Sequence, residues 1–125
     1  SKLGTLASKI SNKELYENQN IVKVITKEDL NNLNFPEAKN FMRKVSNKTQ
    51  NIYHHLGIYC YQREMLKKFI SLDQSQNEIK NNLEQLRALD NGININVALS
   101  KSHTIGVDTQ EDFVAIKKIM EYKSK

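Results

Sequence analysis

The sequence predicts an α/β fold, with a mixed, mostly parallel sheet and flanking helices. Short apolar runs rich in β-branched residues alternate with segments in which apolar residues recur every three or four positions. The chain has 125 residues, of which 38% are hydrophobic and 26% charged, and this is the composition of one folded, soluble domain. No internal repeat or low-complexity tract divides the chain.

Four segments are expected to form strands: residues 6–10, 21–25, 55–61 and 93–99. Residues 26–50 are polar, contain Pro36 and are expected to form loop or irregular structure. Four strands make a small sheet, and parallel strands need cover on both faces. Because the chain also opens directly into a strand, we expect an N-terminal part of the sheet to be missing, so that residues 1–125 form a single partial domain.

Three helices are expected after the clearest strand. Residues 63–72 form a short amphipathic segment. A second helix is expected over residues 78–90, where Ile79 and three leucines recur at spacings of three and four before a C-cap at Asn91 and Gly92. Thr109 is a suitable N-cap for a last helix that extends to about Tyr122.

The cysteine count and the charge limit the function classes. The single cysteine, Cys60, excludes an internal disulfide and a cysteine-based zinc site, and we expect a buried, unreactive thiol in a cytoplasmic protein. The net charge is +5, but the lysines are scattered and no aromatic residues interleave with them. We therefore expect no nucleic-acid partner, although a weak nucleic-acid binder stays open. No apolar run approaches the roughly 20 residues of a membrane helix, so no membrane partner is expected.

The strand at residues 55–61 carries the most informative pattern. Side chains alternate between the faces of a strand, so His55, Gly57 and Tyr59 share one face. The missing side chain at Gly57 would leave a gap between an imidazole and a phenol, where a small polar ligand could sit. From the pattern alone, a histidine and a tyrosine on an ordinary half-exposed strand are the simpler interpretation.

Other polar residues also admit two interpretations. Glu84 and Gln85 lie beside the apolar stripe of their helix, where they could bind sugar hydroxyls or form a solvated edge. Asp108 precedes a helix and could be its N-cap, with Glu111 closing the capping box. Arg87 is expected to pair with a nearby acid.

Three motifs, in this order and spacing, resemble one family. They are HLGIY at residues 55–59, LEQLR at residues 83–87 and GVDT at residues 106–109. The series resembles the C-terminal half of the CMP-Kdo synthetases, or 3-deoxy-manno-octulosonate cytidylyltransferases. The resemblance covers nearly the whole chain but about half of the family's length. It implies the C-terminal half of a Rossmann-like nucleotide-diphospho-sugar transferase fold.

The resemblance also implies a reaction and its residues. The family joins the sugar acid Kdo to CMP, using CTP and Mg²⁺ and releasing pyrophosphate, and the product serves lipopolysaccharide synthesis. Its members are homodimers, with contacts largely from this half. Arg43 resembles a family arginine, although Met42 replaces the usual serine before it. By resemblance, Kdo is bound by His55, Tyr59, Glu84, Gln85 and Arg43, and Mg²⁺ by Asp108.

The family's N-terminal half carries the loop that binds the CTP phosphates. No glycine-rich phosphate loop occurs in this sequence. We therefore expect this chain alone to have no cytidylyltransferase activity. The alternative is a non-catalytic sugar-acid-binding or dimerisation module.

Overall fold

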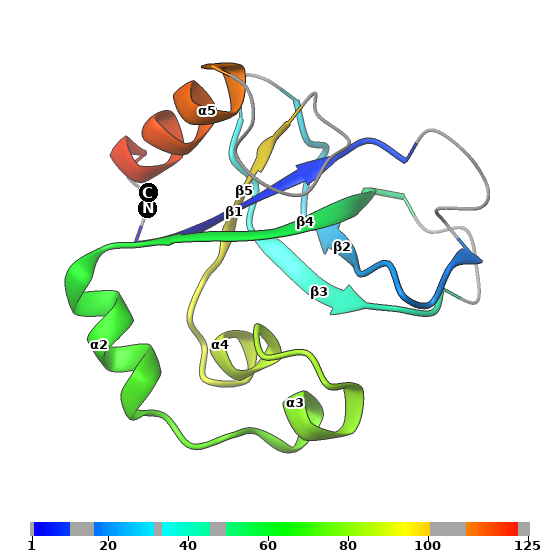
Figure 1. Ribbon diagram of the computed structural model, residues 1–125, viewed down its shortest axis with the longest axis vertical. Helices are drawn as coiled ribbons and strands as arrows, with labels where there is room; N and C mark the ends of the chain where they lie inside the picture. Colours follow the sequence, from blue (N-terminus) through cyan, green and yellow to red (C-terminus); the bar gives the residue numbers. More distant parts are fainter. Residues whose placement is uncertain (1, 11–16, 32–33, 46–49, 101–109, 123–125) are drawn as a thin grey trace.

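The computed structural model describes residues 2–10, 17–31, 34–45, 50–100 and 110–122, and of residues 110–112 the backbone alone. Within this part of the chain five strands form one sheet, in the order β3-β2-β4-β1-β5 (Figure 1). They are β1 (Leu3–Ser8), β2 (Lys23–Thr26), β3 (Ala38–Met42), β4 (Ile52–Tyr61) and β5 (Asn96–Leu99).

The sheet is mixed, but the prediction of mostly parallel pairing is wrong. Only β1 and β5 pair in parallel, whereas β1–β4, β4–β2 and β2–β3 are antiparallel. A parallel pair needs a long crossover, usually through a helix. Helices separate β1 from β5 along the chain, whereas β2 ends at Thr26 and β3 begins at Ala38, which leaves a connection shorter than a usual parallel crossover.

Strand β3 was missed because its side chains do not alternate. It lies at one edge of the sheet, and its adjacent residues Lys39 and Asn40 are both exposed. The register of β2 on β3 also shifts between Ile25 and Thr26. An irregular edge strand of this kind lacks the period-two pattern on which a strand prediction depends.

Four helices complete the described fold: α2 (Arg63–Ser71), α3 (Gln76–Asn81), α4 (Leu86–Asp90) and α5 (Gln110–Glu121). The helix predicted over residues 78–90 is in fact the pair α3 and α4. It breaks at Asn82, whose φ of 53° is left-handed, a conformation that asparagine tolerates at a helix end. The break turns Leu83 into the core, where its side chain is buried. The predicted N-cap of the last helix, Thr109, lies outside the described residues.

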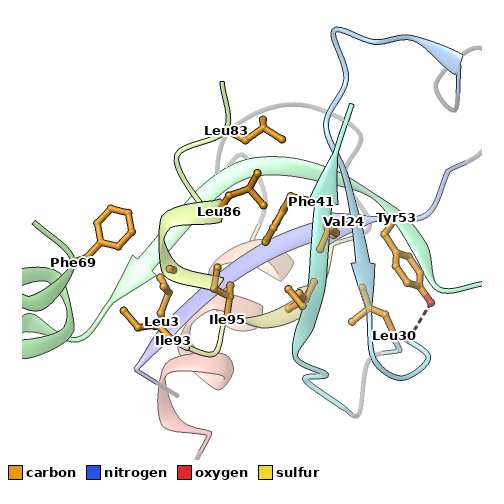
Figure 2. Close-up of a cluster of buried hydrophobic side chains, with 14 residues drawn as sticks. Leu3, Val24, Leu30, Phe41, Tyr53, Phe69, Leu83, Leu86, Ile93 and Ile95 are labelled. Atoms are coloured by element: carbon orange, nitrogen blue, oxygen red, sulfur yellow. Dashed lines mark hydrogen bonds between the residues drawn. The ribbon is translucent and has the colours of Figure 1, made fainter. Parts of the chain in front are cut away.

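Helices cover both faces of the sheet, as predicted (Figure 1). On one face α5 packs through Ile119 against a small apolar cluster that includes Leu6, Leu56 and Ala98. On the other face the larger core joins α2 and α4 to the strands. Figure 2 shows Leu83 and Leu86 on the helical side of this core and Phe41 and Val24 on the strand side.

The alternation predicted for β4 is confirmed for its apolar face. Leu56, Ile58 and Cys60 pack on the α5 side, whereas Tyr59 and Tyr61 pack on the side of α2 and α4. Cys60 is half-buried rather than fully buried as predicted, and burial raises the pKa of its thiol, in the direction expected of an unreactive cysteine. None of the helices in the described ranges is long and apolar enough to span a membrane.

Candidate functional site

A bulge in β4 shapes the candidate site. The register on β1 runs from Thr5 opposite Tyr59 to Ala7 opposite His55, so the β4 residues 56–58 stand against Leu6 alone. The Thr5 hydroxyl donates to the Ile58 carbonyl at 2.6 Å and so fastens the bulge from the neighbouring strand. Bulges of this kind re-aim side chains within a sheet. Here the bulge keeps both rings on one face.

The predicted gap between His55 and Tyr59 is absent, and that prediction is wrong. The two rings are in contact, with 5.3 Å between their centroids. Gly57 is instead exposed on the bulge, and a Cβ added there would meet no atom within 4 Å. Its φ of +76° is left-handed, a conformation that glycine adopts at no steric cost. The backbone conformation therefore explains the glycine at this position.

His55 is buried as a neutral imidazole. Its Nε2 lies 2.8 Å from the Thr5 hydroxyl oxygen. Because the one hydrogen of that hydroxyl goes to Ile58, Nε2 must carry the hydrogen of this second bond, which leaves Nδ1 as the acceptor of the ring. Burial, with a smaller contribution from nearby His54, lowers the pKa of His55 from 6.5 to about 4. At neutral pH this ring can accept a hydrogen bond but offers no positive charge.

The Tyr59 hydroxyl is a buried polar group without a hydrogen-bond partner among the described residues. Burial, followed by the proximity of Tyr61 and Glu84, raises the pKa of Tyr59, so the phenol stays protonated. An unsatisfied buried hydroxyl costs roughly 1–3 kcal/mol. Such a group is expected where a polar ligand or a water molecule completes the structure.

The connection between α3 and α4 brings Glu84 and Gln85 to the same face. Glu84 is exposed and Gln85 is half-buried. Glu84 lies close enough to contribute to the raised pKa values of both Tyr59 and Tyr61. The Glu84 carboxylate thus lies near the buried phenol, and Gln85 follows it in the chain.

An ion pair holds this connection in place. Arg87 of α4 donates from Nε and Nη2 to the two carboxylate oxygens of Glu78 in α3, at 2.9 and 2.6 Å. Its guanidinium also lies over the Phe69 ring, 4.9 Å from the centroid. The prediction that Arg87 pairs with a nearby acid is confirmed. The hydrogen bonds from Arg87 are the main reason why the pKa of Glu78 is lowered.

Arg43 reaches the same connection from the end of β3. Its Nη2 donates to the Asn82 carbonyl at 3.2 Å, two residues before Glu84. A hollow of about 350 Å³ lies between β3 and the helices α3 and α4, and Phe41 is among its lining residues. The Phe41 ring also contacts the ring of His55. His55 and Tyr59 do not line this hollow themselves. The five residues predicted to bind the sugar therefore lie around one face of the sheet.

The predicted metal ligand cannot be placed in this arrangement. Asp108 lies outside the described residues, and the side chain of Glu111 is likewise not described. In the part of the chain that the structure does describe, no group of three or more histidine, cysteine, aspartate or glutamate side chains could hold a metal ion.

Two residues of this region were missed by sequence reasoning. Thr5 orients His55, but a threonine in a strand gives no signal because β-branched residues are common there. Lys23 binds the main chain of Arg43 at 2.6 Å, and it did leave a signal. It is a charged residue inside the apolar run at residues 21–25, and buried lysines are rare.

The sequence of this chain matches a known protein family. Residues 1–116 match the model of a protein family described as cytidylyltransferase. The chain belongs to the cytidylyltransferase family.

Among its relatives in this family are two 3-deoxy-manno-octulosonate cytidylyltransferases. The one from Bartonella tribocorum is 40% identical over 120 residues, which cover 94% of this chain and 48% of the relative. The one from Thermodesulfovibrio yellowstonii is 38% identical over 124 residues, with the same coverage of 94% and 48%. The chain thus spans about half the length of the curated relatives that it matches.

A solved cytidylyltransferase has the same fold. It is CMP:2-keto-3-deoxy-manno-octonic acid synthetase complexed with CTP, which superimposes with a TM-score of 0.68 at 30% sequence identity. The match covers 96% of this chain and 49% of that structure. The α/β fold and the family resemblance drawn from the three motifs are both confirmed.

Proposed function

We propose that this member of the cytidylyltransferase family supplies the sugar-acid-binding surface of a 3-deoxy-manno-octulosonate cytidylyltransferase. That activity joins Kdo to CMP from CTP, with release of pyrophosphate, for lipopolysaccharide synthesis. The observation that carries the proposal is the buried hydroxyl of Tyr59, which has no hydrogen-bond partner among the described residues, on a ring that contacts neutral His55 near the Glu84 carboxylate. A sugar acid brings the hydroxyls and the carboxylate that these groups can bind.

Each side chain suits a different part of such a ligand. The Tyr59 phenol is protonated and can donate, whereas Nδ1 of His55 and the carboxylate of Glu84 can accept from sugar hydroxyls. Gln85 can do both. Because His55 is neutral, the charge that balances the sugar carboxylate falls to Arg43, whose guanidinium suits a carboxylate in two-point contact.

The metal, the assembly and the location belong to the proposal as well. We propose that Asp108 contributes an oxygen to Mg²⁺, which when bound would neutralise phosphate charge, and that the protein is a cytoplasmic homodimer. Pyrophosphate release by this chain alone, with CTP, Kdo and Mg²⁺ supplied, is expected to stay at background because its sequence holds no glycine-rich phosphate loop. Turnover by the chain would contradict that expectation.

Tyr59→Phe tests the sugar-binding proposal. Calorimetric titration with Kdo should show a loss of affinity of roughly tenfold, the value of one good hydrogen bond. The melting temperature should hold or rise, because the change removes a buried hydroxyl that has no hydrogen-bond partner among the described residues. Unchanged Kdo affinity would contradict the proposal.

Tyr53→Phe is the matched control on the same strand. Its hydroxyl accepts from the Leu30 amide at 2.9 Å and donates to Asp29 at 2.8 Å (Figure 2 shows the bond to Leu30). Removal of this hydroxyl should lower the melting temperature and leave Kdo affinity unchanged. Tyr59→Phe should thus lower Kdo affinity without loss of stability, and Tyr53→Phe should lower stability without loss of affinity. DNA titrated in the same way should give no binding signal.

A further inference from the structure

Lys23 is a charged residue in the interior of the sheet. Its side chain is 0% exposed, and its strand neighbours are His54 on β4 and Met42 on β3. The ammonium donates to two main-chain carbonyls, those of Asn18 and Arg43, each at 2.6 Å. Among the residues that the structure describes, no carboxylate pairs with it.

A buried cation of this kind is costly for a strand that could otherwise be apolar. Burial of a charge without an opposite charge is among the least favourable changes in a protein interior. The neighbours of Lys23 in sequence, Val22 and Val24, show that apolar β-branched side chains suit this strand. Burial and the nearby Arg43 both lower the pKa of Lys23. The benefit that offsets this cost must therefore come from the main-chain groups that the ammonium binds.

The ammonium holds the main chain of Arg43. Asn18 precedes β2 and Arg43 follows β3, so the two short hydrogen bonds tie together the segments that flank these strands. From that fixed main chain, the Arg43 guanidinium reaches the Asn82 carbonyl at 3.2 Å. Arg43 has no carboxylate partner within the described part of the chain. Two cations thus lie close together with no acid between them, which suits the approach of an anion.

We propose that Lys23 is a positioning residue for the sugar carboxylate. Its buried ammonium fixes the backbone at Arg43, and this sets the Arg43 guanidinium against the α3–α4 connection. The inference rests on the proposed function, because Arg43 is the group assigned to the carboxylate. It goes further by naming a residue that touches no substrate.

A double-mutant cycle tests this indirect role. Lys23→Met removes the ammonium but keeps the length of the side chain. Titrated with Kdo, Arg43→Ala should lose at least roughly tenfold in affinity and Lys23→Met roughly three- to tenfold. In the Arg43→Ala background, Lys23→Met should cause no further loss, because the residue through which it acts is gone. Losses that multiply independently would overturn the proposal.

Lys27→Met is the matched control. Lys27 follows β2 directly, but it is exposed and pairs with Glu37 at 3.0 Å. Its replacement should leave Kdo affinity unchanged. If Lys23→Met does not fold, Lys23→Gln takes its place in the cycle, because its amide keeps two N–H donors without the charge. In the Arg43→Ala background, Lys23→Gln should then likewise cause no further loss of Kdo affinity.

A second measurement needs no ligand and separates this proposal from the proposed function. If the unmodified chain does not bind Kdo, the proposed function fails. The NMR signal of the Arg43 Nε–H group, recorded without ligand, then tests the positioning. Lys23→Met should shift or broaden this signal, and Lys27→Met should leave it in place. An unchanged Arg43 signal in folded Lys23→Met would overturn the role of Lys23.

Discussion

The ring of His55 meets the ring of Tyr59 edge to face, with centroids 5.3 Å apart and planes inclined at 62°. The two residues flank the bulge of β4, and Thr5 binds both His55 and the bulge itself. An imidazole whose Nδ1 can accept and a phenol that can donate are therefore held together by the sheet.

His55 should make stability fall in mild acid. Its pKa is about 4 in the folded protein against 6.5 in the unfolded chain, so the unfolded chain takes up the proton first as the pH drops. The contribution is fully present above pH 6.5 and is lost as the pH falls toward 4. It amounts to roughly 3 kcal/mol, at about 1.4 kcal/mol for each pKa unit.

Urea unfolding between pH 7 and pH 4 measures this effect. His55→Gln has no titrating ring, so its free energy of unfolding should depend less steeply on pH over that range. Carboxylates contribute alike to both proteins and cancel in the comparison. Equal pH dependence in the two proteins would show that the His55 pKa is not lowered.

The two glycines of the β1–β4 pair should resist substitution for different reasons. Gly57→Ala should destabilise by roughly 1–2 kcal/mol because φ is +76°, although the space around it is open. Gly57→Asn should cost less, since asparagine tolerates this conformation. Gly4→Ala should cost roughly 1–3 kcal/mol through overlap, because its Cβ would lie 3.0 Å from both the Cys60 sulfur and Ile119. Thermal melting of the three variants measures these losses, and Gly57→Asn should melt at a higher temperature than Gly57→Ala.

The Glu78–Arg87 ion pair should contribute more to stability than the N-cap of α3, in which Glu78 also takes part. Glu78→Gln leaves Arg87 without its counter-charge at a nearly buried site and should cost roughly 3 kcal/mol. Ser75→Ala removes only the hydroxyl that caps α3, and should cost about 1 kcal/mol. Denaturant unfolding measures both. A smaller loss for Glu78→Gln than for Ser75→Ala would show that the ion pair does not hold the α3–α4 connection.

Asp108→Asn separates a metal ligand from a helix cap. Asparagine caps helices about as well as aspartate, so the melting temperature should not change. It lacks the charge that Mg²⁺ favours, so the Mg²⁺-dependent rate of CMP-Kdo formation should fall by at least roughly 10- to 100-fold. Both are measured on a full-length 3-deoxy-manno-octulosonate cytidylyltransferase in which this chain replaces the half that it matches. A near-normal rate would leave Asp108 as a cap alone.

The sequence by itself determined the local features of this protein. The HLGIY motif predicted a strand with one apolar face, and that face packs under α5. The apolar spacing around the LEQLR motif predicted that Leu86 faces the core, and the family match followed from the order of the motifs. These features depend on alternation, caps and spacing, which are properties of neighbouring residues.

The tertiary structure alone decided how distant segments meet. The antiparallel pairing of β4 with β1 and β2, the bulge that turned Gly57 outward and the bond from Lys23 to Arg43 each join residues far apart in the sequence. The break between α3 and α4 belongs with them, because Leu83 enters the core and Arg87 pairs with Glu78 only when the chain folds back. Helical spacing continues smoothly through residues 82–85, so the competition between helix propensity and burial appears only once the core is assembled.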